Sequence, residues 1–264
     1  LGQAADHVRD FFRMLRAELA FYVGCLNLHE ALSHAGYPTC MPTPYPPHEH
    51  RLAFRGLYDP GLALTLNGPV APNDLEADGT LLVFITGPNS GGKTTFLRSL
   101  GAAQLMMQAG MFVPAEGYRA SLCDGLFTHF PRGEDVRMER GKLDEELSRM
   151  SEIVDRLRPD SVLLVNEAFA STNEREGSEI ARQILRALTE RGVRVFFVTH
   201  LFELSRSFQG LDGVLFLRAE RLPDGTRTYR IRVGEPLATS HGEDVYRRVF
   251  GPAPDPAPVG RTPP

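Results

Sequence analysis

The stretch Leu81-Leu82-Val83-Phe84-Ile85-Thr86-Gly87-Pro88-Asn89-Ser90-Gly91-Gly92-Lys93-Thr94 decides how this chain folds. It begins with an apolar run that is typical of a buried strand and continues into a glycine-rich loop with the Walker A spacing. A helix is predicted directly after it, because apolar residues recur there on one helical face: Phe96, Leu100, Ala103 and Met107. A strand, a phosphate-binding loop and a helix in this order predict a nucleotide-binding protein.

Each part of this loop has a predicted physical role. Glycines let backbone N–H groups turn inward around phosphate oxygens, and the positive end of the helix dipole favours the same negative charge. Lys93 is predicted to bring a mobile positive charge to the phosphates, and Thr94 to place its hydroxyl on Mg²⁺. The predicted nucleotide-binding residues of this segment are Gly87, Pro88, Asn89, Ser90, Gly91, Gly92, Lys93, Thr94 and Thr95.

Length and composition limit the other function classes. With 264 residues, of which 42% are hydrophobic, the chain can bury one full α/β core and a small appendage, but hardly two large domains. The net charge of −4 and the lack of a lysine or arginine run give no electrostatic footprint for nucleic acid. The apolar stretch at residues 19–28 is far too short to cross a bilayer. Three cysteines without metal-ligand spacing fit a reducing compartment, so we expect a cytoplasmic protein without a membrane partner.

The residues before the loop divide into a helix and a proline-rich connector. Residues 4–35 are predicted to form one long helix that Gly36 ends. Its apolar stripe is expected to be core: Phe12, Leu15, Leu19, Tyr22 and Leu26. The prolines between Tyr37 and Pro47 exclude both helix and central strand, so this segment is expected to run extended and to mark a boundary.

Short strands are predicted between the connector and the loop. Residues 51–80 alternate apolar pieces with turn signals at Asp59-Pro60, Asn67-Gly68 and Pro72-Asn73-Asp74. This pattern predicts strands and turns that lead into the strand before the phosphate-binding loop.

From Leu81 onward, buried strands alternate with helices. Further strands are predicted at Ser161–Val165 and Val193–Val198, with a helix at Gly177–Arg191 between them, which indicates a mainly parallel sheet with helices on both faces. A hairpin is then predicted from residues 214–222 and 226–233 around Pro223-Asp224-Gly225. The proline-rich residues 251–264 are expected to be disordered.

Two strand ends carry the candidate catalytic and metal-binding residues. Asn166-Glu167 follows the second strand, where Mg²⁺-linked and catalytic carboxylates reach the sheet edge. Glu167 is the candidate general base that polarises water, although the same side chain on a surface turn would simply be solvated. Asn166 can reach Mg²⁺ through a water but lacks negative charge, which predicts weaker Mg²⁺ binding or slower turnover. His200 ends the third strand and is predicted to sense the γ-phosphate, with a purely structural role as the alternative.

Further short motifs accompany these strand ends. In chain order they are Pro72-Asn73-Asp74, Ile85–Thr95, Phe112-Val113-Pro114-Ala115, Phe127-Thr128, Asn166-Glu167 with Ser171-Thr172 and Gly177, and Thr199–Leu204. With these motifs the chain resembles the ATPase domain of the MutS family of DNA mismatch-repair proteins, within the wider ABC-type ATPases. The resemblance covers roughly residues 5–245.

The resemblance implies a fold, cofactors and partners. It implies an α/β P-loop NTPase of the ABC/MutS type over residues 51–250, after the end of a lever-like helix region at 1–36 and a connector at 37–50. It also implies ATP and Mg²⁺ as cofactors, ADP as product, and a homodimer that closes two composite sites through the ATPase face. Asn73 is expected near the nucleotide base. Coupling to DNA through the long helix is implied by the resemblance alone.

The chain departs from the family pattern at several positions. Asn166 stands where the family has aspartate, and Asp59-Pro60 where it has a histidine before proline. A gap-free count back from Asn166 puts Gly141 where the family usually has a serine that reaches the partner's γ-phosphate. Lys142 could replace the missing hydroxyl or simply be a solvated helix start. Glu134-Asp135 resembles the acidic pair before this segment.

Three functions follow from these patterns. The leading hypothesis is a dimeric MutS-like ATPase coupled to DNA, in mismatch repair or related DNA maintenance. The second is a nucleotide-gated clamp or binding module that hardly hydrolyses ATP, which Asn166 and Gly141 motivate. The third, a small-molecule kinase, is weaker because such an enzyme needs an acceptor pocket and a lid.

Overall fold

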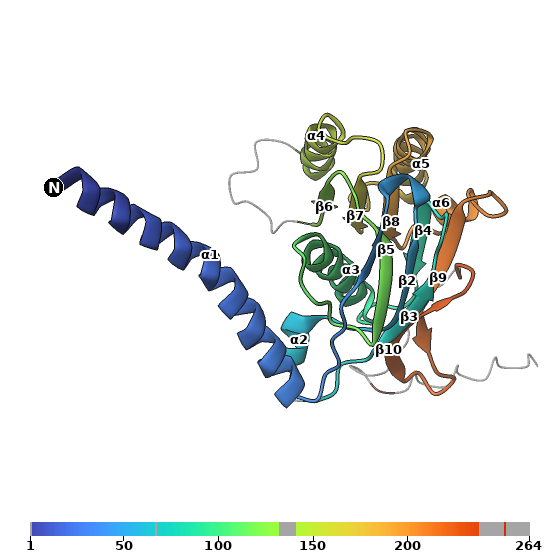
Figure 1. Cartoon of the computed structure of the whole chain (residues 1–264). Coiled ribbons are helices and arrows are strands. Elements are labelled where there is room, and N and C mark those ends of the chain that lie inside the picture. The colour runs from blue at the N-terminus through green and yellow to red at the C-terminus, as the bar shows by residue number, and fades with distance from the viewer. Residues whose placement is uncertain (1, 67, 132–140, 238–250, 252–264) are drawn as a thin grey trace, which may run out of the picture.

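A long helix leads into a two-sheet α/β body. The computed structural model describes residues 2–66, 68–131, 141–237 and 251. Helix α1 (Gly2–His34) projects away from the other elements, and only its C-terminal end reaches them (Figure 1). Among the residues that the structure describes, no helix combines the length and apolar character needed to cross a membrane. The proposed tail after Gly251 lies outside the described residues.

The apolar stripe of α1 is largely exposed, so the expectation that it is core is wrong for this chain. Four members have exposed fractions between 51% and 63%: Phe12, Leu19, Tyr22 and Leu26. The fifth, Leu15, is partly exposed. Among the side chains of α1 that the structure describes, only Leu32 near the C-terminal end is buried, because it joins a small cluster with Tyr58, Ala63 and Val70. A helix that projects from the body has nothing in the described chain against which its stripe can pack.

The proline-rich segment runs beside the smaller sheet. It contributes the short strand β1 (Thr43–Tyr45) and a single 3-10 turn, η1 (Pro47–Glu49). Strand β1 lies at the edge of its sheet, where a proline does not interrupt a ladder. Pro47 occupies the first position of the turn, which needs no N–H donor.

The smaller sheet has the strand order β1-β5-β2-β3. Its other strands are β2 (Leu52–Leu57), β3 (Asn73–Glu76) and β5 (Gly117–Ser121). Asp59-Pro60 does not form the expected turn but starts helix α2 (Pro60–Thr65), since the Asp59 carboxylate accepts a hydrogen bond from the Leu62 N–H at 2.9 Å. Asn73 and Asp74 likewise open strand β3 instead of forming a turn. The expected turn at Asn67-Gly68 includes Asn67, which lies outside the described residues.

The larger sheet has the order β10-β9-β4-β8-β7-β6. Its strands are β4 (Leu82–Thr86), β6 (Leu126–His129), β7 (Val162–Asn166), β8 (Arg194–Val198), β9 (Val214–Arg221) and β10 (Arg227–Val233). All neighbours pair in parallel except β9 and β10, which form the predicted antiparallel hairpin. The carboxyl ends of β4, β7 and β8 therefore meet at one edge of the sheet.

Helices cover both faces of the larger sheet (Figure 1). Helix α3 (Lys93–Gln108) buries its predicted apolar face against Val83 and Ile85. On the opposite face lie α4 (Lys142–Val154), α5 (Glu174–Glu190) and the short α6 (Phe202–Arg206). Leu82 and Phe84 belong to the core on this second side, as the alternation of side chains along a strand requires.

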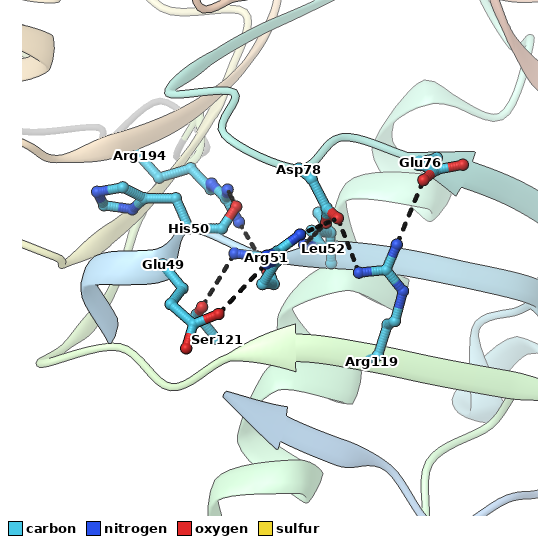
Figure 2. Close-up of polar contacts among 9 residues, drawn as sticks. All are labelled: Glu49, His50, Arg51, Leu52, Glu76, Asp78, Arg119, Ser121 and Arg194. Carbon is cyan, nitrogen blue, oxygen red and sulfur yellow. Dashed lines mark hydrogen bonds and ion pairs between the residues drawn. The ribbon is translucent and has the colours of Figure 1, made fainter. Parts of the chain in front are cut away.

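A polar cluster fastens the two sheets together, as Figure 2 shows. The buried Arg194, at the start of β8, donates hydrogen bonds to the backbone carbonyls of Thr80, Arg51 and His50. Burial lowers the pKa of Arg194 to about 10. Beside it, the Asp78 carboxylate accepts hydrogen bonds from the Leu52 N–H and from two arginines, Arg51 and Arg119. The cluster lies near the start of β8, so it fixes the sheets at the end opposite the phosphate-binding loop.

Candidate functional site

The phosphate-binding loop is packed tightly between β4 and α3. Gly87 and Gly92 have left-handed φ values of 112° and 92°, which glycine adopts without strain. A Cβ at Gly87 or Gly91 would approach atoms of Ala219 on β9 to 3.0 and 2.9 Å. These positions therefore need glycine, and strand β9 forms one wall of the loop.

Lys93, the first residue of α3, turns back onto the loop. Its Nζ donates hydrogen bonds to the carbonyl oxygens of Gly87 and Pro88, both at 3.0 Å. Only 4% of the residue is exposed, and burial lowers its pKa to about 8. Glu167 opposes this lowering, whereas Arg227 adds to it. A buried cation is thus held within the loop, where a phosphate group would neutralise it.

The predicted Mg²⁺ residues lie side by side. The Thr94 hydroxyl donates a hydrogen bond to Oδ1 of Asn166 at 3.0 Å, although 72 positions separate the two residues. A hydroxyl and an amide oxygen are hard ligands of the kind that Mg²⁺ accepts together with phosphate and water. No group of three or more acidic, histidine or cysteine side chains in the described part of the chain forms an all-protein metal site. The two side-chain oxygens thus fit a Mg²⁺ ion whose other ligands would be phosphate oxygens of a nucleotide and water.

Glu167 and His200 form a pair next to this position. Oε1 of Glu167 lies 2.9 Å from Nε2 of His200. This hydrogen bond lowers the pKa of Glu167, against the effect of burial, and Lys93 adds a smaller lowering. Glu167 also has a left-handed φ of 52°, an uncommon conformation that points to a functional constraint. The carboxylate is ionised at neutral pH and oriented by the histidine.

The loop after Glu167 is held by a residue that the sequence patterns did not identify. Glu146 of α4 is buried, and its carboxylate accepts hydrogen bonds from the Phe169 N–H at 2.9 Å and the Ser171 hydroxyl at 3.4 Å. On its other side, the Phe169 carbonyl packs so closely on Gly177 that a Cβ there would overlap it. An acidic residue on the apolar side of α4, three positions after Leu143, was the available signal.

A cavity of about 420 Å³ opens beside the loop. It is lined by apolar residues of α2 and the following segment and by loop and helix residues that include Ser90, Gly92, Thr94 and Thr95. The expected base-proximal residue Asn73 is part of its wall, with Oδ1 accepting a hydrogen bond from the Ile231 N–H at 2.7 Å. Tyr229, which no sequence motif singled out, also lines it.

Gly141, the residue that the gap-free count aligns with the family's signature serine, is the N-terminal cap of α4. Gly141 caps this helix without a side-chain hydrogen bond, and Lys142 beside it is exposed. The Glu134-Asp135 pair lies outside the described residues. The structure therefore brings Lys93, Thr94 and the two strand ends together, whereas Gly141 and Lys142 form no hydrogen bond or ion pair with them among the described residues.

Comparisons with known proteins agree with this arrangement. Residues 83–245 match the family model described as MutS domain V, and residues 1–35 match the one described as MutS2 N-terminal domain. The DNA mismatch repair protein MutS of Thermus aquaticus is 34% identical over 66% of this chain, and the endonuclease MutS2 of Geobacillus kaustophilus is 36% identical over 67%. MutS of Methanosarcina acetivorans is 26% identical over 87%. The matches cover 21%, 23% and 26% of those relatives, so this chain spans about a quarter of their length or less.

Proposed function

This chain belongs to the MutS family, and we propose that it is a Mg²⁺-dependent ATPase module built on a P-loop NTPase domain. One observation carries the proposal: the loop at Gly87–Gly92, the Thr94–Asn166 contact and the Glu167–His200 pair lie at one edge of the larger sheet. These are the parts that phosphoryl transfer to water requires: a phosphate cradle, oxygen ligands for a cation and a carboxylate for the water.

Each residue has a role in this proposal. Lys93 and the loop amides hold the β- and γ-phosphates of ATP, since the buried ammonium already faces the loop. Thr94 and Asn166 hold Mg²⁺, directly or through water, and the ion neutralises charge on the phosphates when it is bound. Glu167 orients and polarises the attacking water. His200 keeps the Glu167 carboxylate ionised and in place, and it senses the γ-phosphate from the same position.

The cavity beside the loop is proposed to take the nucleotide base. Its volume of about 420 Å³ and its apolar lining suit a flat heterocycle. Asn73 uses its oxygen to hold β10, and its amide nitrogen donates a hydrogen bond to the Ala71 carbonyl at 3.4 Å. The second N–H of this amide is the group proposed to reach an acceptor on the base. Tyr229 supplies an aromatic side chain at the open side, where 56% of the residue is exposed.

Dimerisation and DNA belong to the proposal through the family. We propose that residues 51–250 act as a cytoplasmic ATPase domain that pairs with a second copy, and that residues 1–36 carry the movement through the connector at 37–50. Two relatives are named DNA mismatch repair proteins and one an endonuclease, which supports a role in mismatch repair or related DNA maintenance. The exposed apolar stripe of α1 supports a contact between this helix and a partner other than its own ATPase domain.

A second function has its own support. Asn166 gives Mg²⁺ no charged ligand, and Gly141 offers a partner's nucleotide no hydroxyl. A clamp that closes on ATP and hardly hydrolyses it would need neither group.

Steady-state turnover separates the two functions. The protein is assayed with MgATP beside its Glu167→Ala variant, which keeps the binding loop but removes the water-orienting carboxylate. The ATPase proposal expects a rate well above that of Glu167→Ala. Equal rates would exclude the ATPase function and favour the nucleotide-gated clamp.

A further inference from the structure

Arg227 lies on the side of the β9–β10 hairpin that faces the phosphate-binding loop. It pairs with Arg221 across the hairpin, and residues paired in this way point to the same face of a sheet. Arg221 and Ala219 are two positions apart on β9, so they also share a face. Ala219 packs on Gly87 and Gly91 of the loop. The alternation of side chains therefore directs Arg227 toward the loop.

The hairpin is fixed in this position by a bulge. The register of β10 against β9 shifts between Arg227 and Ile231, and Tyr229 within the bulge has a left-handed φ of 59°. The bulged backbone presses against the start of α3, since a Cβ on Gly92 would lie 3.1 Å from the Tyr229 carbonyl oxygen. The hairpin that carries Arg227 thus contacts the loop through both of its strands, at Ala219 of β9 and at Tyr229 of β10.

The guanidinium of Arg227 is incompletely paired. Its Nη1 atom is buried and has no hydrogen-bond partner among the described residues. An arginine cannot shed its proton to relieve such burial, so a buried, unpaired N–H group costs free energy unless something binds it. Native proteins rarely keep such groups without a reason, and an anionic ligand is one.

Arg227 and Lys93 concentrate positive charge at one place. Lys93 lies on the loop through its hydrogen bonds to the carbonyls of Gly87 and Pro88, and the hairpin that carries Arg227 packs on the same loop. Glu167, the acidic residue that follows β7, is already paired with His200. The positive charge of two cations beside backbone N–H groups exceeds the negative charge of this one carboxylate, so the site favours an anionic ligand.

We infer that Arg227 is a second cationic ligand for the phosphate chain of the bound nucleotide, acting beside Lys93. This inference rests on the proposed function and adds a residue to its binding site. A guanidinium offers several N–H donors in a plane and matches phosphate oxygens in a way that an ammonium does not. The site would therefore favour nucleoside di- and triphosphates over monophosphates.

The affinity for MgATP tests this directly by isothermal titration. Arg227→Gln is expected to weaken binding about tenfold, the usual effect of losing a charge-assisted hydrogen bond. Arg227→Lys should retain part of the affinity. Arg230→Gln is the matched control, because Arg230 is an exposed arginine on the same strand, and it should bind within about twofold of the parent. Binding by Arg227→Gln that equals that of the control would overturn the inference.

A second measurement needs no substitution, so it holds even if Arg227→Gln fails to fold. Phenylglyoxal modifies arginines, and mass spectrometry of peptides reports each site. ATP should protect Arg227 more than AMP does, and neither should protect Arg230. Equal labelling of Arg227 with and without ATP would contradict the inference.

Lys93→Ala distinguishes the failure of this inference from the failure of the proposed function. If MgATP binding is lost in Lys93→Ala but unchanged in Arg227→Gln, only the assignment of Arg227 is wrong. If the unsubstituted protein itself binds no MgATP, the proposed function fails.

Discussion

The carboxylate of Glu146 accepts a hydrogen bond from the backbone N–H of Phe169 at 2.9 Å, which ties helix α4 to the loop that follows Glu167. The same carboxylate is 3.4 Å from the Ser171 hydroxyl. Helix α4, which Gly141 caps, is thereby connected to a backbone position two residues after Glu167, the proposed catalytic carboxylate.

Glu146→Ala is expected to lower the free energy of unfolding by about 2 kcal/mol, because it leaves a buried N–H group without a partner. Urea unfolding measures the loss. Glu152→Ala on the same helix is the control, since this residue is exposed, and its effect should stay below about 0.5 kcal/mol. Equal stability of the two variants would mean that the Glu146 contact does not hold the loop.

Gly177→Ala tests the packing of the Phe169 carbonyl, in the loop that Glu146 also holds. A Cβ at this position would overlap the Phe169 carbonyl oxygen, so we expect a loss of about 1–3 kcal/mol, as for overpacking in a core. Gly24→Ala makes the same substitution in exposed α1, where nothing lies within 4 Å of the added Cβ. That variant should gain about 0.5–1 kcal/mol from helix propensity. Thermal unfolding of both variants measures these changes in stability. An unchanged stability of Gly177→Ala would show that the loop can move away from the added Cβ.

The polar cluster between the sheets predicts how stability depends on pH. Burial alone would raise the pKa of Asp78, but hydrogen bonds from two arginines and the Leu52 N–H lower it overall. An acid whose pKa is lowered by folding stabilises the folded state above its unfolded pKa of about 3.9 and loses this effect as the pH falls through the folded value.

Asp78→Asn is therefore expected to cost about 1–2 kcal/mol at pH 7 and progressively less below about pH 4. Urea unfolding of the variant and the parent between pH 3 and pH 7 checks this. Asp155→Asn, at the exposed end of α4, should show no such dependence. A difference in the free energy of unfolding between Asp78→Asn and the parent that stays constant from pH 3 to pH 7 would assign the effect of Asp78 to packing alone.

Asn166→Asp should raise the apparent affinity for Mg²⁺ during ATP hydrolysis. The added charge lies next to the Thr94 hydroxyl, so the free Mg²⁺ concentration for half-maximal ATP hydrolysis should fall on the order of tenfold. Asn173→Asp is the same substitution at the cap of α5, where either residue serves, and it should leave the Mg²⁺ dependence unchanged. A response of Asn166→Asp no larger than that of the control would separate Asn166 from the metal.

Local patterns predicted the parts of this site that depend on short segments. The loop at Gly87–Gly92, the helix after it and the strand ends at Asn166 and Thr199 each follow from periodicity and spacing within a few residues. Their meeting at one edge follows from parallel pairing, which the alternation of strands and helices already implied.

Features that depend on distant packing were missed or misjudged. The stripe of α1 has the periodicity of a core helix, yet it is exposed because periodicity does not say what lies opposite. Asp59 starts a helix where a turn was expected, because aspartate before proline suits both. Glu146 and Tyr229 contact residues far along the chain, and no spacing rule connects such positions.

We propose that this chain binds MgATP in the loop that Lys93 closes. Titration calorimetry with MgATP on the parent and on Lys93→Ala, with the fold of both checked by circular dichroism, tests it most directly. One MgATP should bind to each parent chain, and the folded Lys93→Ala variant should lose this binding. A parent that binds no MgATP, or a variant that binds it as tightly as the parent, would contradict the account.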